Sequence, residues 1–521
     1  MKETIFLFFY LIHFIFTKQQ ILITNNLLLE NKIKENNICE KKKDFMRKIY
    51  CYPNIEDESL LENEPIDVVI KYIDLFDNTL IREGIPQFNK DYENGEIKYC
   101  IRSILKYIPW VNKIFILMPN EKVKFFKDYE KIKEKIIYVK DKDVLGFDSA
   151  ASPVFEFNLW RLKNFGLSEN FIYFNDDYFV GNYLKKSDFF YVENNKVVPY
   201  ILGKKSQVNR ESIQKYYNIY YNIISKREKL TLDTKEYFVR INGTRLFIYK
   251  LFGDNAKIIG NNHNALPDNY FESEEIYNII LNKHYNPNAS LKAIFRDKDQ
   301  LIYQEFRINY LLNKYNRQIK DLKCVYYDIR NKIKNADLYV VNTGGGKNYE
   351  DSHRRKSLIQ LNYNFPTPSK YEIIEIIKDG YYILETELKN NLVINFGFVG
   401  KKKKRNVLYL NTKKNRASEV FFIKYQNDNS YLIKSVYGKK FLGVNKENIK
   451  KVKISFDEKN EGNKVKWLIL PNLNNYFIIS QVNLNCILSV KTFKSKNYSK
   501  ILCEYPNGKD NQLFKLIPVE D

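Results

Sequence analysis

Short apolar runs alternate with amphipathic stretches over the first two thirds of the chain. Four apolar runs predict buried strands, at residues 66–70, 113–117, 135–139 and 171–180. Apolar side chains at helical spacing predict helices over 96–107 and 156–164, and the pattern from about 205 to 335 is mostly helical. Strands that alternate with helices of this size predict an α/β domain with a doubly wound, mostly parallel sheet.

The tail has a different pattern, because helical periodicity stops near residue 372 and a threefold β repeat follows. Each repeat opens on a tyrosine-led strand (Tyr382, Tyr431, Tyr476), continues with a second apolar run (392–394, 441–444, 487–490) and closes on an aromatic residue (Phe421, Trp467, Phe514). The closing aromatics recur about every 46 residues, a period typical of internal repeats. This predicts an all-β trefoil whose closing aromatics are core residues.

Four segments follow from these patterns: a signal peptide or signal anchor at 1–18, a poorly ordered stem at 19–64, an α/β domain at 65–372 and the trefoil at 373–521. The apolar run from Ile5 to Phe16 is shorter than the roughly 20 residues that span a membrane. No small-residue cleavage site is evident, so an uncleaved N-terminal membrane anchor stays an alternative. Both send the chain into the secretory pathway, to the ER or Golgi lumen or out of the cell.

Sequons and cysteines agree with that compartment. Asn-x-Ser/Thr sequons stand at Asn242, Asn288 and Asn497. The six cysteines are too sparse for a disulfide scaffold and lack the spacing of a zinc site. By proximity in the sequence, Cys39 with Cys51 and Cys486 with Cys503 are expected to close local loops.

Charge and composition narrow the class of partner. The chain is 44% hydrophobic and 15% aromatic, which indicates a globular protein, and its net charge of +23 favours anionic partners. Zinc-finger spacing, RNP sequences and basic heptads are lacking, so nucleic acid is not expected as a partner. The sequence does not indicate an oligomeric state.

Candidate chemistry gathers where the apolar run at 171–180 is interrupted by Asn175, Asp176 and Asp177. At the end of a buried strand these residues reach the carboxyl edge of an open α/β sheet, where ligands bind. Adjacent carboxylates suit Mg²⁺ or Mn²⁺, which proteins commonly share with substrate phosphates. The alternative is a turn with two solvated aspartates.

Several segments resemble, in order, the conserved blocks of the Stealth sugar-phosphate transferases. These are Ile66–Asp77, then Tyr99–Ile116 continued by Ser152, Glu156–Arg161 and Gly166–Asp177, then Val239–Asn242, Asn262–Pro267 and Phe295–Asp299, and last Val340–Asn342 with Phe365–Glu372. The resemblance implies a GT-A-like catalytic domain that transfers a sugar-1-phosphate, such as GlcNAc-1-phosphate, from a UDP-sugar. The acceptor is a hydroxyl of a glycan, polysaccharide or glycoprotein, and the product is a phosphodiester.

The same resemblance implies roles for individual residues. The catalytic set is His263 as general base with Arg296, Asp299 and Asn242, and the metal ligands for Mg²⁺ or Mn²⁺ are Asp176 and Asp177. Substrate and nucleotide are expected to contact Asp74, Asp77, Arg102, Glu156, Asn158, Arg161, Asn175 and Asn342, although Arg102 is also a candidate structural residue. The tail resembles ricin-type lectins, whose Gln-x-Trp signature corresponds here to Gln512 and Phe514.

Two other functions fit the same residues. A conventional metal-dependent glycosyltransferase would use the acidic pair to hold a nucleotide-sugar and would release a nucleoside diphosphate. An inactive, glycan-binding scaffold would explain Thr343, which stands where the family carries a carboxylate. Retention of Asp74, Asp176, Asp177, His263 and Arg296 favours an enzyme.

Overall fold

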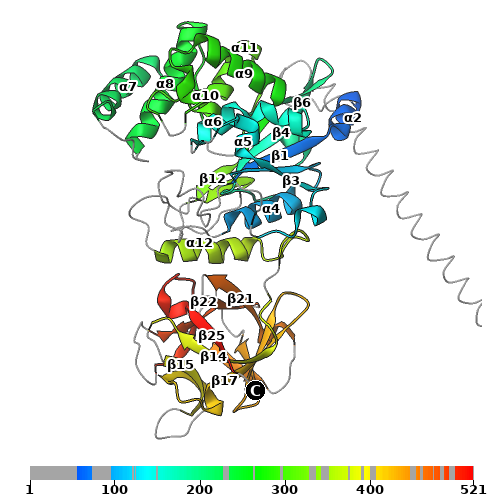
Figure 1. The fold of residues 1–521 in the computed structure, drawn as a ribbon, viewed down its shortest axis with the longest axis vertical. Helices are drawn as coiled ribbons and strands as arrows, with labels where there is room; N and C mark the ends of the chain where they lie inside the picture. Colours follow the sequence, from blue (N-terminus) through cyan, green and yellow to red (C-terminus); the bar gives the residue numbers. More distant parts are fainter. Residues whose placement is uncertain are drawn as a thin grey trace, which may run out of the picture.

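The computed structural model describes residues 55–72, 95–119, 123, 125–147, 149, 151–226, 234–261, 265–293, 297–327, 336–341, 351–373, 376–388, 392–398, 406–445, 453–457, 462–472, 475–481, 486–491 and 499–519. They form an α/β part and an all-β barrel, with helix α12 (Asp351–Asn364) between the two (Figure 1). The structure therefore has a mixed α/β part and an all-β tail, and the exact domain bounds stay predictions.

The α/β part is built on a five-stranded sheet in the order β10-β4-β1-β2-β3. Its strands are β1 (Ile66–Lys71), β2 (Ile114–Met118), β3 (Ile136–Lys140), β4 (Asn170–Asn175) and β10 (Leu266–Asn269). The first four run parallel, and β10 is an antiparallel edge strand. The mostly parallel sheet is confirmed, and the strand order reverses direction at β1.

Both faces of this sheet are buried, which explains why its strands are continuously apolar. Val68 and Ile70 of β1 join the cluster that contains helix α4 (Glu96–Tyr107), whereas Val69 joins the cluster of α6 (Ser152–Phe157). Alternate side chains of one strand thus serve two separate cores.

Helices dominate the region from 205 to 335, as predicted. They are α7 (Arg210–Ile224), α8 (Thr234–Phe252), α9 (Tyr270–Lys283), α10 (Pro287–Leu291) and α11 (Tyr303–Tyr315). Outside this region, the short helix α5 (Asp141–Leu145) follows β3. The smaller sheets comprise β5 (Tyr178–Val180), β6 (Phe190–Glu193), β7 (Lys196–Pro199), β8 (Ile201–Gln207), β9 (Ile259–Asn261), β11 (Ile319–Lys320), β12 (Cys324–Tyr327) and β13 (Leu338–Val341).

Two local predictions were wrong. The helix expected over 156–164 is instead α6 followed by a 3₁₀ helix (Leu159–Phe165), because Asn158 turns its amide onto the carbonyls of Val154 and Leu291. Helix α2 (Ile55–Asn63) lies within the stem predicted to be poorly ordered. Leu61 of this helix is buried, although most of the helix sequence is polar.

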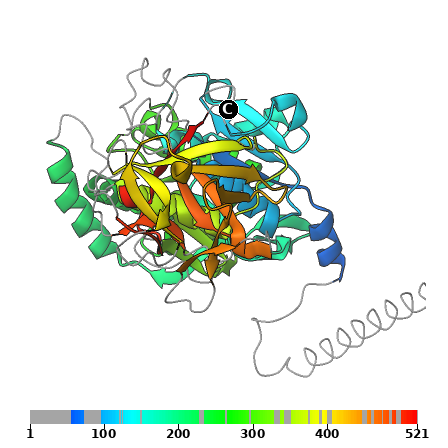
Figure 2. The same ribbon diagram turned by 90° about the horizontal axis from the view of Figure 1, so that it is seen from below.

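The tail is a closed barrel with three attached hairpins, which is the strand arrangement of the predicted trefoil. Six strands close the barrel: β14 (Gly380–Thr386), β17 (Val420–Tyr425), β18 (Tyr431–Ser435), β21 (Lys466–Asn472), β22 (Asn475–Ser480) and β25 (Phe514–Pro518). The hairpins are β15 (Leu392–Phe398) with β16 (Asn406–Thr412), β19 (Phe441–Asn445) with β20 (Lys453–Asp457), and β23 (Ile487–Val490) with β24 (Ile501–Glu504). Figure 2 shows this barrel in front of the α/β part.

The closing aromatics are core residues, as predicted: Phe421, Trp467 and Phe514 are all buried in one cluster. A disulfide joins Cys486 to Cys503, which confirms that predicted pair. The other predicted pair, Cys39 with Cys51, lies outside the described residues, as does the predicted signal segment.

The barrel packs against the α/β part through α12. Leu358 and Leu361 of α12 share a hydrophobic cluster with Phe477 and Leu513 of the barrel, and Arg355 forms an ion pair with Asp510. The two parts therefore share a hydrophobic core and are not joined by a linker alone.

Among the described helices, none has the length and apolar character needed to cross a lipid bilayer.

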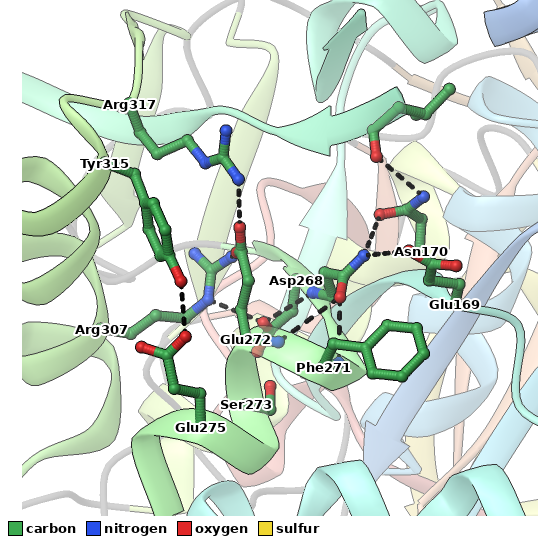
Figure 3. Close-up of polar contacts among 12 residues, drawn as sticks. Glu169, Asn170, Asp268, Phe271, Glu272, Ser273, Glu275, Arg307, Tyr315 and Arg317 are labelled. Carbon is green, nitrogen blue, oxygen red and sulfur yellow. Dashed lines mark hydrogen bonds and ion pairs between the residues drawn. The ribbon is translucent and has the colours of Figure 1, made fainter. Parts of the chain in front are cut away.

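A buried ionic network holds the edge strand β10 to the helices (Figure 3). Arg307 of α11 and Asp268 of β10 are both fully buried, with Nε 2.7 Å from Oδ1. The Tyr303 hydroxyl donates to the other Asp268 oxygen at 2.6 Å, and Arg307 also reaches Glu272 of α9 at 3.3 Å. Each of these charges is paired inside the protein. Removing one partner would therefore leave the other charge buried without a counter-ion, which is unfavourable in a medium of low polarity.

We expect Arg307→Leu to lower the free energy of unfolding by about 3 to 5 kcal/mol, since Asp268 would be left buried without its cation. Lys163→Met is the matched control, because the Lys163–Glu274 pair is partly exposed and costs about 1 kcal/mol or less. Urea denaturation followed by circular dichroism measures both. Equal destabilisation in the two variants would contradict the role of the network.

Candidate functional site

The acidic pair lies where β4 leaves the central sheet, as predicted. β1 pairs with β4 in parallel register, so that Lys71 is level with Asn175 at the carboxyl ends of both strands. The chain then turns at Asp176 and Asp177 before β5. Since β1 has β2 on one side and β4 on the other, this is the switch point of the sheet, where ligands of α/β folds bind.

Both aspartates are half-buried and sit in a negative environment. Loss of solvent contact, then the Asp177 and Glu96 carboxylates, raise the pKa of Asp176 well above its ordinary value. Loss of solvent contact and Glu96 raise the pKa of Asp177 to about 7. Glu96 belongs to the first turn of α4, which therefore begins beside the pair. A cation placed between these carboxylates would offset the repulsion.

Lys71 of β1 supplies positive charge near Asp176, although its place in the sequence did not suggest this role. Its ammonium lies 2.8 Å from Asp141, at the start of α5, and 4.3 Å from the centre of the Phe155 ring. It also donates to the Tyr72 carbonyl at 3.1 Å. These contacts fix Lys71 near Asp176, where it partly opposes the rise in the pKa of that carboxyl.

Asn175 adjoins the pair at the end of β4, and Glu156 lies near Tyr173 of the same strand. The Tyr173 hydroxyl donates to Asn175 Oδ1 at 2.8 Å, which orients the amide. Burial, then the charge of Glu156, raise the pKa of Tyr173, so the carboxylate of this buried α6 residue lies near that ring. The structure thus brings Asn175 beside Asp176 and Asp177, and it places Glu156 near Tyr173.

The pair fits a divalent ion in one particular way. Across the described residues, no group of three or more His, Cys, Asp and Glu side chains is arranged to hold a metal. Mg²⁺ is often held by one or two carboxylates, with substrate phosphates and water filling its other positions. Asp176 and Asp177 match that donor set.

A second group of predicted residues lies on α8 and on the segment before α11. Asn242 is only 4% exposed inside α8, which excludes it as a glycosylation site in the folded protein. Asp299 is half-buried, and its Oδ1 atom has no hydrogen-bond partner among the described residues. Arg240 of α8 reaches Gln300 at 3.4 Å, which ties the two elements together.

Three predicted substrate-binding residues have protein groups as partners. Arg102 donates to both oxygens of Glu372, from Nε at 3.0 Å to Oε1 and from Nη2 at 2.6 Å to Oε2, and to the Phe365 carbonyl at 2.7 Å. It lies beside a cavity of about 540 Å³ lined by α4 and residues 365–371. Asn158 bonds to two carbonyls, and Arg161 lies against Trp160 and Tyr277. These contacts make all three scaffold residues, and their contact with substrate stays a prediction.

Five predicted site residues lie outside the described residues: Asp74, Asp77, His263, Arg296 and Asn342. The described chain resumes two residues after His263, and β10 then pairs with β4 from Leu266 opposite Tyr173. Their roles stay predictions.

The lectin-like pair of the barrel is part of its framework. Gln512 is fully buried, donates to Ser489 Oγ at 3.0 Å and the Tyr505 carbonyl at 2.8 Å, and accepts from the Asn507 amide at 2.8 Å. Phe514 is a core residue. Sugar binding through these two residues stays a prediction.

Comparison with known proteins shows which proteins this chain is similar to in sequence. Residues 90–198 match the model of Stealth protein conserved region 2. The chain is 27% identical over 368 residues to the capsular polysaccharide phosphotransferase WcwK of Streptococcus pneumoniae, covering 64% of this chain and 94% of that protein. It is 32% identical over 167 residues to a capsular polysaccharide phosphotransferase of Neisseria meningitidis serogroup B, covering 29% and 43%.

Among solved structures, partial similarity is found to an agglutinin and to a lectin. The Rhizoctonia solani agglutinin is 15% identical, with 28% of this chain and all of that chain covered at a TM-score of 0.25. The Macrolepiota procera ricin B-like lectin, solved in complex with lactose, is 12% identical at a TM-score of 0.23. Such low scores support no conclusion, so the assignment of the tail's fold rests on the strand pairing described above.

If Asp176 and Asp177 hold a divalent ion, Mn²⁺ will raise the melting temperature of the wild-type protein and will do so much less in Asp177→Asn. Asp143→Asn is the control, because Asp143 is an exposed carboxylate on α5. Differential scanning fluorimetry with and without EDTA measures the shift. An equal shift in all three proteins would place the ion elsewhere.

Proposed function

This chain carries the conserved region 2 of the Stealth proteins, and we propose that it is a phosphotransferase that moves a sugar phosphate from a nucleotide-sugar to a sugar hydroxyl. One observation carries the proposal. Asp176 and Asp177 lie inside the matched region, at the switch point of the sheet. The relation to capsular polysaccharide phosphotransferases along most of one relative's length supports the reaction class.

In this reaction the acceptor oxygen bonds to the phosphorus that carries the donor sugar. The bond from that phosphorus to the bridging pyrophosphate oxygen breaks, so a nucleoside monophosphate leaves, and the hydroxyl proton passes to a base. Little covalent chemistry falls to the protein, which must position both substrates and neutralise charge.

The described residues suit that task. When bound, a Mg²⁺ or Mn²⁺ ion on Asp176 and Asp177 would neutralise charge on the donor diphosphate. Lys71, held by Asp141, keeps a positive charge beside this acidic cluster. Asn175, oriented by Tyr173, offers its amide group to a substrate at the same edge of the sheet.

We assign the base to His263, whose ordinary pKa near 6.5 suits the acceptance of a hydroxyl proton at neutral pH. The described chain resumes at Ala265, close to the end of β4 that carries the acidic pair. Arg296 would donate to the transferred phosphoryl group, and Asp299 and Asn242 would contact the acceptor.

The finer assignments extend the proposal. The donor would be a UDP-sugar such as UDP-GlcNAc, and the acceptor a glycan, polysaccharide or glycoprotein. A GT-A-like catalytic domain would work in the secretory lumen, free or anchored by the N-terminal segment, and the barrel would bind glycan in the manner of ricin-type lectins.

The test is the identity of the released nucleotide when purified protein meets a panel of UDP-sugars, Mn²⁺ and simple glycosides. We expect UMP that depends on both metal and acceptor. Release of UDP would instead assign a conventional glycosyltransferase, and no nucleotide from any pair would favour the inactive scaffold.

His263→Ala should lower kcat by about 100-fold or more while the melting temperature stays within the range of wild type, because a general base contributes to rate and not to folding. Asp177→Asn should lose activity as well, whereas Asp143→Asn should keep it. Wild-type rates in His263→Ala or Asp177→Asn would remove that residue from the mechanism.

A further inference from the structure

Helix α7 is unusually exposed for its composition. Of its 15 residues only Ile213 and Ile224 are buried, although four tyrosines lie between them. By helical spacing these tyrosines fall on two flanks, Tyr216 with Tyr220 and Tyr217 with Tyr221. Tyr216 is exposed and the other three are half-buried, and a partly exposed aromatic surface of this kind often marks a binding site.

One flank is joined to the candidate catalytic residues. The rings of Tyr217 and Tyr221 stack with centroids 5.2 Å apart, and Tyr217 lies over Gly243, the neighbour of Asn242. A Cβ atom on Gly243 would lie 3.2 Å from the Tyr217 ring, so glycine permits this close approach.

The same flank also contacts the segment that carries Asp299. Tyr217 interacts with the hydroxyl of Tyr285, which in turn interacts with the Asp299 carboxylate. The Lys298 ammonium lies 5.3 Å from the centre of the Tyr221 ring. Tyr217, Tyr221 and Tyr285 thus form one surface, here named the tyrosine wall, that ends at Asp299.

Two features of the wall indicate what it binds. Asp299 Oδ1 is buried and has no hydrogen-bond donor among the described residues, so it can accept a hydrogen bond from a ligand hydroxyl. Along the helix beside the wall run the exposed amides of Gln214, Asn218 and Asn222. Ring faces, amides and one open carboxylate oxygen suit a sugar, which has apolar C–H faces and hydroxyl edges.

We propose that the tyrosine wall binds the acceptor glycan, holding sugar units next to the one whose hydroxyl reacts. This inference rests on the proposed function, because it takes Asn242 and Asp299 as the acceptor side of the site. The place of the wall favours the acceptor over another protein chain as its occupant, since Tyr217 lies against Gly243, the neighbour of Asn242.

The test compares the two flanks of the same helix. Tyr217→Ala/Tyr221→Ala removes the wall, and Tyr216→Ala/Tyr220→Ala, on the flank that stacks on Phe238, is the control. UMP release is measured with acceptors of one, three and six sugar units built from mannose, N-acetylglucosamine or galactose. We expect wild type and control to show a lower KM for longer acceptors, and the wall variant to raise the KM of the six-unit acceptor about tenfold at unchanged kcat.

Three results would overturn the proposal: wild-type KM independent of acceptor length, equal effects of the two double variants, or a dimer that dissociates in the wall variant during sedimentation. Failure of the proposed function would look different, since no acceptor would then release UMP. In that case, the affinity of wild type and of both double variants for the six-unit glycans is measured by calorimetry. Loss of binding in the wall variant alone supports the wall, and equal or absent binding overturns it.

Discussion

The parallel pairing of β1 with β4 is the constraint on which the site depends. Both strands are buried on both faces, so a charged side chain inside them needs a hydrogen-bond partner, as Asp67 of β1 has, and the other charged groups appear where the strands end. The register that puts Lys71 level with Asn175 therefore fixes where Asp176 and Asp177 emerge. Two half-buried carboxylates whose pKa values are raised by burial and by the nearby Glu96 indicate a place prepared for positive charge.

The remainder of the α/β part holds β4 in place. On one side, Asp67 of β1 accepts from the Lys113 and Ser168 amides at 2.8 and 2.7 Å, which ties together the segments that lead into β2 and β4. On the other side, the ion pair of Asp268 with Arg307 anchors β10, which pairs with β4. Rigid placement of this kind is what phosphoryl transfer asks of a protein, since its catalysis is mainly positioning and charge neutralisation.

The sequence predicted whatever depends on local pattern. The strands at 66–70 and 113–117 and the helix at 96–107 were predicted closely because apolar periodicity reports burial directly. The helix over 156–164 was missed in part because its break depends on a contact between Asn158 and Leu291, far along the chain. The pairing of Lys71 with Asp141, and of Arg102 with Glu372, likewise arises only when the chain is folded. The role proposed for Tyr217 could not be predicted from the sequence. It depends on the close approach of the Tyr217 ring to Gly243 of α8, which is seen only in the folded chain.

The measurement that tests the central claim most directly follows one oxygen atom. A UDP-sugar labelled with ¹⁸O between the anomeric carbon and phosphorus would be incubated with the protein, Mn²⁺ and an acceptor, and the products examined by mass spectrometry and ³¹P NMR. Sugar-phosphate transfer predicts that the label stays with the sugar in a phosphodiester, while the released UMP is unlabelled. Label found in released UDP, with a glycosidic product, would contradict the account.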